Sequence, residues 1–183
     1  MRKTMLAFVV FTLALTPLAF ASQDQRTDQQ VFNDIAKAVN RYSFFTIFDD
    51  VNVDVTNGVA TLTGKVTQPF KSGEIAKRAA KVAGVHSVVN QIVVLPLSGF
   101  DDSLRYRIAR SIYGNQNFWN YAVMAYPPIH IVVDRGRVTL TGVVQSDVDR
   151  AIARSLATFE FGVFSVTNEL KTAAEMKALR ATS

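Results

Sequence analysis

An internal repeat is the feature that most constrains this chain of 183 residues. Residues 58–64 read Gly-Val-Ala-Thr-Leu-Thr-Gly, and residues 136–142 read Gly-Arg-Val-Thr-Leu-Thr-Gly. A second block, residues 83–90, returns at the same spacing as residues 161–168. Two separated blocks in one register indicate a duplicated structural module. The remaining length suits two domains of about 70 residues each.

Each copy shows the same order of hydrophobic patterns. Apolar residues at every fourth position predict a first helix in each copy, with core residues Val31, Ile35 and Val39, then Leu104, Ile108 and Ile112. Two strands, a second helix and a last strand follow, and the strands are expected at 51–55, 59–66 and 86–94, then 129–133, 137–144 and 164–171. A crossover helix makes one strand pair parallel. The predicted fold class is α+β, with two αββαβ repeats, each a three-stranded mixed sheet packed against two helices.

The repeat also sets the predicted boundaries. Residues 26–95 form the first domain, residues 100–171 the second, and residues 172–183 a helical or frayed C-terminal tail. Before the first strand the repeat spacing is 73 residues, so the second copy has five extra residues between its first helix and first strand. Local signals agree with the elements: Asn57-Gly58 predicts a tight hairpin turn, and Ser146 with Asp149 resembles a capping box.

The first 21 residues resemble an export signal. Arg2 and Lys3 precede an apolar run at residues 5–15, which is too short to span a bilayer comfortably. Residues 19–21 read Ala-Phe-Ala, so we expect cleavage between Ala21 and Ser22. The alternative is an uncleaved N-terminal anchor. Because the chain has no cysteine, a lipid anchor at the new N-terminus is not expected.

Composition narrows the function classes. Zero cysteine excludes disulfides, iron–sulfur clusters and thiol catalysis. Without the two basic residues of the signal, the net charge falls from +5 to +3. Such a mild charge does not suggest a nucleic-acid-binding protein.

Catalytic and metal-binding motifs are weak. His86 and His130 are the two histidines, and neither has further metal ligands at suitable spacing. Asp101 and Asp102 stand at a predicted helix start, where carboxylates favour the helix dipole. Gly58 belongs to a hairpin and not to a strand–turn–helix phosphate cradle. We therefore expect no enzyme activity, no metal and no cofactor.

The repeated pattern resembles a known family. Gly136 to Val144 followed by Gly162 to Asn168, with a close variant in the first copy, is similar to the BON domain (bacterial OsmY and nodulation domain). The resemblance implies OsmY-like αββαβ domains in the periplasm of Gram-negative bacteria. It also implies non-catalytic binding of phospholipid or envelope proteins. An exported, processed and unlipidated periplasmic protein is the resulting expectation.

The first helix of the second copy suggests a binding surface. When its apolar stripe faces the core, Tyr106, Arg110 and Tyr113 share the outward face, with Arg107 at its edge. The five-residue insertion follows directly and contains Trp119, the single tryptophan. Tyr and Trp suit a bilayer interface, and Arg binds phosphate. We hypothesise that these five residues contact an anionic phospholipid surface.

Other interpretations remain open. Phe118, Trp119 and Tyr121 would equally suit a loop that buries its own aromatic residues, and the arginines would suit an ordinary solvated face. The second helix of the first copy, with Lys71 and Lys77, suits either a solvated face or a weaker membrane contact. Edge strands of small sheets favour a different function class, a protein-interaction or chaperone-like module for envelope proteins under stress.

Overall fold

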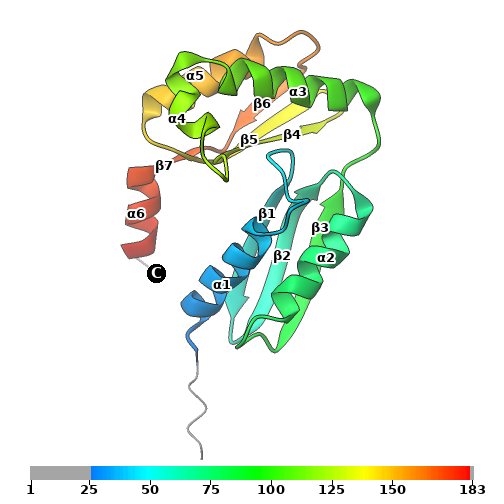
Figure 1. Cartoon of the computed structure of the whole chain (residues 1–183), viewed down its shortest axis with the longest axis vertical. Helices are drawn as coiled ribbons and strands as arrows, with labels where there is room; N and C mark the ends of the chain where they lie inside the picture. Colours follow the sequence, from blue (N-terminus) through cyan, green and yellow to red (C-terminus); the bar gives the residue numbers. More distant parts are fainter. Residues whose placement is uncertain (1–25, 182–183) are drawn as a thin grey trace, which may run out of the picture.

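The computed structural model describes residues 26–181, and the export-signal prediction with Ala21 and Ser22 lies outside these residues. The chain forms two modules, one above the other in Figure 1. The elements of the first module are α1 (Asp28–Asn40), β1 (Asp50–Thr56), β2 (Val59–Val66), α2 (Pro69–Ala80) and β3 (Ser87–Val94).

The second module repeats this order and adds to it. It begins with α3 (Gly99–Tyr113), and the inserted residues form the short helices η1 (Gln116–Phe118) and α4 (Trp119–Ala122). The remaining elements are β4 (Ile129–Asp134), β5 (Arg137–Val144), α5 (Asp147–Thr158), β6 (Ser165–Asn168), β7 (Lys171–Thr172) and α6 (Ala173–Ala181).

Both sheets are mixed, which confirms the predicted fold class. β1 pairs antiparallel with β2, and β2 pairs parallel with β3. β4, β5 and β6 repeat this arrangement, and β7 adds a short parallel pairing to β5. The last strand predicted at 164–171 is divided into β6 and β7, which pair with β5 in one register, and the Glu169 amide between them still donates to the Leu140 carbonyl at 2.8 Å. At that interruption the side chain of Leu170 is buried in the core of the module.

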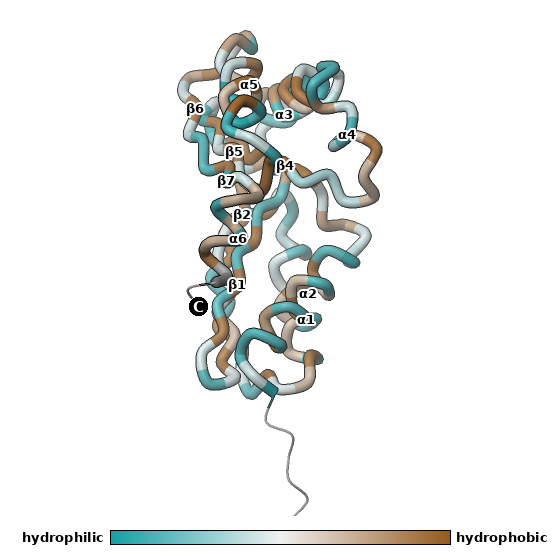
Figure 2. The backbone as a smooth tube through the Cα atoms, turned by 90° about the vertical axis from the view of Figure 1, so that its left-hand side faces the viewer, coloured by the Kyte–Doolittle hydropathy of each residue, from teal (hydrophilic) through white to brown (hydrophobic). Residues whose placement is uncertain are grey.

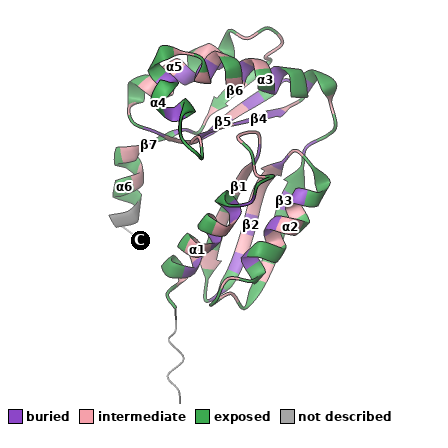
Figure 3. Ribbon diagram, viewed as in Figure 1, coloured by how far each residue is buried: buried purple, intermediate pink, exposed green. Residues whose placement is uncertain are grey.

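The helices cover one face of each sheet, and the predicted stripes form the cores. Figure 3 shows in purple the buried positions along the helices and strands. The predicted core residues of both first helices are buried: Val31, Ile35, Val39, Leu104, Ile108 and Ile112. Each apolar stripe therefore packs on its own sheet, as amphipathic helices do.

The two hairpins are built alike. Asn57 and Gly58 both have positive φ (52° and 73°), and the equivalent Arg135 and Gly136 have the same values. The carboxylate of Asp101 accepts hydrogen bonds from the amides of both turn residues, at 2.8 and 2.9 Å. Asp101 is buried, so its main role is to satisfy these turn amides and not to face the helix dipole from solvent.

The modules contact each other directly. The loop before β1 reaches the second module, where the Ile131 amide donates to the Ile47 carbonyl at 2.7 Å. Phe48 packs against the second core, and the Thr141 hydroxyl donates to Asp50 at 2.9 Å. Lys65 pairs with Asp134 at 3.3 Å. One end of the first sheet thus lies against the second module.

Candidate functional site

A buried ion pair closes the first module. Asp49 lies just before β1, and Lys71 lies in the first turn of α2, with 2.7 Å between the Lys71 Nζ and an Asp49 carboxylate oxygen. The same carboxylate accepts the amides of Thr46 and Thr67, each at 2.8 Å. Burial would raise the pKa of Asp49, but the hydrogen bonds from Lys71 and the two amides outweigh it and lower this pKa. Lys71 therefore does not belong to a solvated face.

A tyrosine takes the same place in the second module. The Tyr121 hydroxyl accepts the Gln145 amide at 2.7 Å and donates to the Asp149 carboxylate at 2.8 Å. The Ser146 hydroxyl accepts the Asp149 amide at 3.1 Å, which caps α5 as predicted. The Asp149 carboxylate accepts from Tyr121, so the reciprocal half of the predicted capping box is not the bond that forms.

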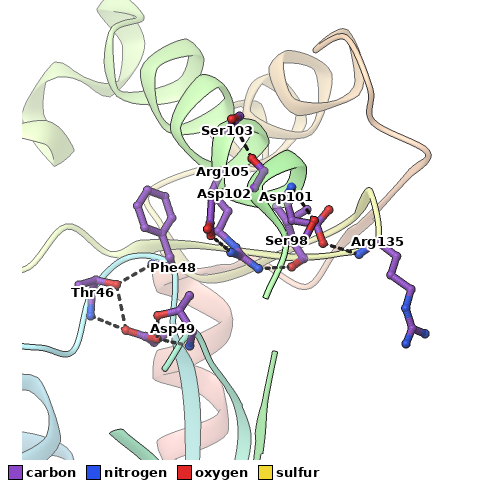
Figure 4. A network of polar contacts seen from close by, with 12 residues as sticks. Thr46, Phe48, Asp49, Ser98, Asp101, Asp102, Ser103, Arg105 and Arg135 are labelled. Carbon is purple, nitrogen blue, oxygen red and sulfur yellow. Dashed lines mark hydrogen bonds and ion pairs between the residues drawn. The ribbon is translucent and has the colours of Figure 1, made fainter. Parts of the chain in front are cut away.

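A third buried polar group is Arg105 on α3, which sequence reasoning missed. Its guanidinium contacts Asp102 and donates to the Val133 carbonyl at 2.6 Å. Figure 4 shows Arg105 below α3, on the side where Phe48 and Asp49 of the loop before β1 lie. The sequence did not predict its burial, because its hydrogen-bond acceptor is a backbone carbonyl of β4 that only the tertiary structure brings near it.

Tyr113 corrects the predicted outward face of α3. Its ring is half-buried, and its hydroxyl donates to the Ile129 carbonyl at 2.6 Å while accepting the Ile129 amide at 3.0 Å. Burial raises the pKa of this hydroxyl. Tyr113 therefore hydrogen-bonds the backbone amide and carbonyl of Ile129 at the start of β4, and it does not present a free hydroxyl to a ligand.

Arg107 is also held by the protein. Its Nη2 donates to the Phe161 carbonyl at 2.8 Å, and its Nε lies 3.9 Å from Glu160. The guanidinium thus links α3 to the loop between α5 and β6. The side chain remains partly exposed, so it contributes positive charge there.

Three predicted residues are exposed. Tyr106 is 64% exposed, and its ring makes an edge-to-face contact with the ring of Phe48, with 5.0 Å between the ring centroids. Arg110 lies exposed in the last turn of α3, and Trp119, which is 69% exposed, begins α4. Exposed apolar residues follow Trp119, and Figure 2 shows the hydrophobic stretch beyond α4. We define the α4 surface as Arg110, Trp119, Val123, Met124 and Tyr126.

The packing interpretation of the insertion holds for two of its three aromatic residues. Phe118 and Tyr121 are buried in the second core, as the packing interpretation predicts. Trp119 lies between them in sequence and points away from that core. The short helices η1 and α4 separate these roles, because a helical turn sends neighbouring side chains in different directions. The insertion is thus anchored from inside and displays its largest ring outside.

A cleft between the modules has a volume of about 360 Å³ and contains aromatic residues from both. Its cations Lys71 and Arg105 are engaged with Asp49 and Asp102. His130 donates from Nδ1 to the Asp49 carbonyl, because a carbonyl oxygen can only accept. Both cations of the cleft are therefore engaged within their own modules, while the contact between His130 and the Asp49 carbonyl joins the two modules.

Neither metal chemistry nor a membrane span is visible in the part of the chain that the structure describes. Among residues 26–181 no group of His, Asp and Glu is arranged to hold a metal ion. No helix within that range is long and apolar enough to cross a bilayer.

Comparison with known proteins identifies the repeat. A family model described as the BON domain matches residues 23–96 and 107–174. No curated protein matches the sequence.

Two solved structures show a distant likeness. One is the C-terminal domain of CdsD, a structural protein of the type III secretion system of Chlamydia trachomatis, with 13% identity and a TM-score of 0.32. That match covers 79% of this chain, which spans 66% of the other. A second CdsD structure has 14% identity and a TM-score of 0.28, covering 84% of this chain and 97% of that one.

Proposed function

We propose, since this chain belongs to the BON domain family, that it is a non-catalytic bacterial envelope protein that binds anionic phospholipid surfaces through its second module. The observation that carries this proposal is the exposure of Trp119 on a segment anchored by the buried Phe118 and Tyr121. Such a segment presents an apolar ring without loosening the module. The BON domain family is non-catalytic.

The α4 surface has the chemistry of a bilayer interface. Trp and Tyr rings suit the boundary between headgroups and acyl chains, because their bodies are apolar and their polar handles stay hydrated. Arg110 supplies a guanidinium that pairs with phosphate. Each cation near an anionic membrane contributes about 1 kcal/mol. Binding should therefore be reversible and salt-sensitive.

The first module lacks this surface. At the repeat position of Arg110 it has Lys37, which pairs with Asp34 at 3.1 Å. It has no counterpart of the inserted residues that form α4. This difference between the modules supports a contact through the second module.

The proposal includes the location of the protein. The predicted export signal would deliver the chain to the periplasm, where cleavage would leave Ser22 as the first residue. Without cysteine, lipidation at that residue is excluded. Membrane contact would then depend on the surface of the folded modules.

Co-sedimentation with vesicles tests the proposal. The protein without residues 1–21 should bind vesicles that contain phosphatidylglycerol or cardiolipin, bind phosphatidylcholine vesicles less, and dissociate as salt increases. The double variant Arg110→Glu with Trp119→Ser should lose most of this binding. The matched control is Lys37→Glu, which makes the same charge reversal on α1. Absence of binding to anionic vesicles at low salt would refute the proposal.

One observation favours a second candidate, a protein-interaction or chaperone-like module for envelope proteins. β3 is an edge of its sheet in the order β1-β2-β3, and the side chains of Val89 and Val93 are exposed. Exposed edges can pair with strands of other proteins. Under this candidate, a lipid-free sample should suppress aggregation of an unfolded envelope protein, and Val93→Lys should weaken that effect while Lys37→Glu should not.

A further inference from the structure

A second exposed aromatic cluster lies at the other end of α3. The loop between α5 and β6 carries Phe159, Phe161 and Phe164, whose side chains are 86%, 87% and 76% exposed. Phe100, at the start of α3, is also exposed and lies against this loop near Gly162. We call these four residues the phenylalanine tip. Its loop projects at the top of the second module in Figure 1.

The fold does not require phenylalanine at these positions. The repeat spacing of 78 residues places Lys81, Ala83 and His86 of the first module opposite Phe159, Phe161 and Phe164. Both loops turn at an equivalent glycine, since Gly84 and Gly162 share a φ of 91°. The first module therefore forms this loop with small and polar side chains. The three phenylalanine rings occur in the second module alone of the two, and formation of the loop does not require them.

The tip is held in place by several contacts. Arg107 donates to the Phe161 carbonyl at 2.8 Å, and the Phe164 amide donates to the Gly136 carbonyl at 2.8 Å. The Arg137 guanidinium lies 5.3 Å from the centre of the Phe164 ring. A rigid loop loses little conformational entropy when its rings enter another phase.

We propose that the phenylalanine tip inserts into the acyl region of an anionic phospholipid bilayer. The exposed Arg135 and Arg137 lie on the adjacent hairpin, and Arg107 contacts the loop itself. The nearby acidic side chain Glu160 lies beside Arg107, while Asp101 is bound to the hairpin amides. The tip thus combines apolar rings with neighbouring arginine side chains. This combination is complementary to a bilayer, in which an apolar interior lies beneath anionic headgroups.

This inference rests on the proposed function and extends it. The tip and the α4 surface lie at opposite ends of α3, whose 15 residues give a length of about 22 Å. The α4 surface has aromatic residues with polar handles and suits the interface, whereas phenylalanine has none and suits greater depth. Two contacts at different depths would define the orientation of the second module on the membrane.

Site-directed labelling tests the depth of the tip. Because the chain has no cysteine, Phe161→Cys provides a single site for an environment-sensitive fluorophore. Ala83→Cys, at the repeat-equivalent position of the first module, is the matched control. With phosphatidylglycerol vesicles, the label at 161 should shift to shorter wavelength and be quenched by lipids brominated in the acyl chain. The label at 83 should do neither.

Trp119 fluorescence in the same samples separates the two proposals. A response from Trp119 without one from the label at 161 would overturn the tip and leave the proposed function standing. A response from 161 alone would support the tip and overturn the role of Trp119. No response from either, with no co-sedimentation, would overturn both. Equal responses at 161 and 83 would also overturn a specific tip.

A variant without labels gives a second measurement. Replacing Phe159, Phe161 and Phe164 with serine should weaken vesicle affinity about tenfold or more, because each ring removes a large apolar area from water. The loss should persist at high salt, unlike that of Arg110→Glu. Unchanged affinity, with an unchanged urea midpoint, would contradict insertion.

Discussion

In the first module the Asp49 carboxylate accepts the Thr67 amide and pairs with Lys71, whereas in the second the Tyr121 hydroxyl accepts the Gln145 amide and donates to Asp149. Thr67 and Gln145 are repeat equivalents, as are Lys71 and Asp149. The same junction between a sheet and its second helix is therefore closed by an ion pair in one copy and by a tyrosine hydroxyl in the other.

This difference shows how the duplicated module could diverge. The backbone amide after the second strand needs an acceptor in both copies, because it is part of the shared fold. The acceptor itself comes from the variable segment before the first strand. In the second module that segment also carries the exposed Trp119. One insertion therefore supplies both the hydroxyl that accepts the Gln145 amide and a new exposed surface.

Of the two junctions, the larger effect is expected from loss of the buried carboxylate. Asp49→Ala should lower the free energy of unfolding by about 3–5 kcal/mol, because it leaves the Lys71 ammonium buried without its partner. Lys71→Met should cost less, since Asp49 would keep its bonds to Thr46 and Thr67. Urea denaturation measures both. A loss below about 1 kcal/mol for Asp49→Ala would show that this pair does not support the first module.

The tyrosine closure should be weaker. Tyr121→Phe keeps the buried ring but removes the acceptor of the Gln145 amide, so we expect a loss of about 1–3 kcal/mol. Urea denaturation with near-ultraviolet circular dichroism would follow the second module. A cost equal to that of Asp49→Ala would remove the energetic contrast between the two closures.

Acid should affect the two closures differently. The pKa of Asp49 is lowered in the fold, so its contribution to stability is complete above its ordinary pKa of about 3.9 and is lost as pH falls toward the folded value. The Tyr121 hydroxyl stays protonated in acid because the ordinary pKa of tyrosine is about 10, and burial raises this pKa further. The difference in urea midpoint between the wild type and Asp49→Asn should shrink below about pH 4. A constant difference down to about pH 2 would contradict this assignment.

The smallest effect on stability is expected at the α4 surface. Trp119→Ser should change the free energy of unfolding by less than about 0.5 kcal/mol, since the ring is exposed. Phe118→Ala, one residue earlier, should cost about 3–5 kcal/mol because that ring is fully buried. Thermal denaturation of the pair would test this division. A large loss for Trp119→Ser would mean that the ring supports the core.

Much of the fold follows from local patterns. The helix stripes ending at Val39 and Ile112, and the turn at Gly58, depend on short-range spacing and backbone preference. The division of the last strand into β6 and β7 was not predicted, since the equivalent strand β3 is continuous and the sequence of the two copies is patterned alike there. The site was predicted less completely. Tyr106, Arg110 and Trp119 are exposed as expected, whereas Tyr113 and Arg107 are bound by distant backbone groups.

By itself the sequence determined the duplication, the order of helices and strands, and the position of the insertion, since these depend on periodicity along the chain. The tertiary structure decided which polar and aromatic side chains remain free. Helical periodicity places Tyr113 and Tyr106 on one side of α3, but the carbonyl of Ile129 lies beside only the first of them. Residues 159–164 form a cationic, aromatic surface only where the fold brings Arg107 and the β4–β5 hairpin against them.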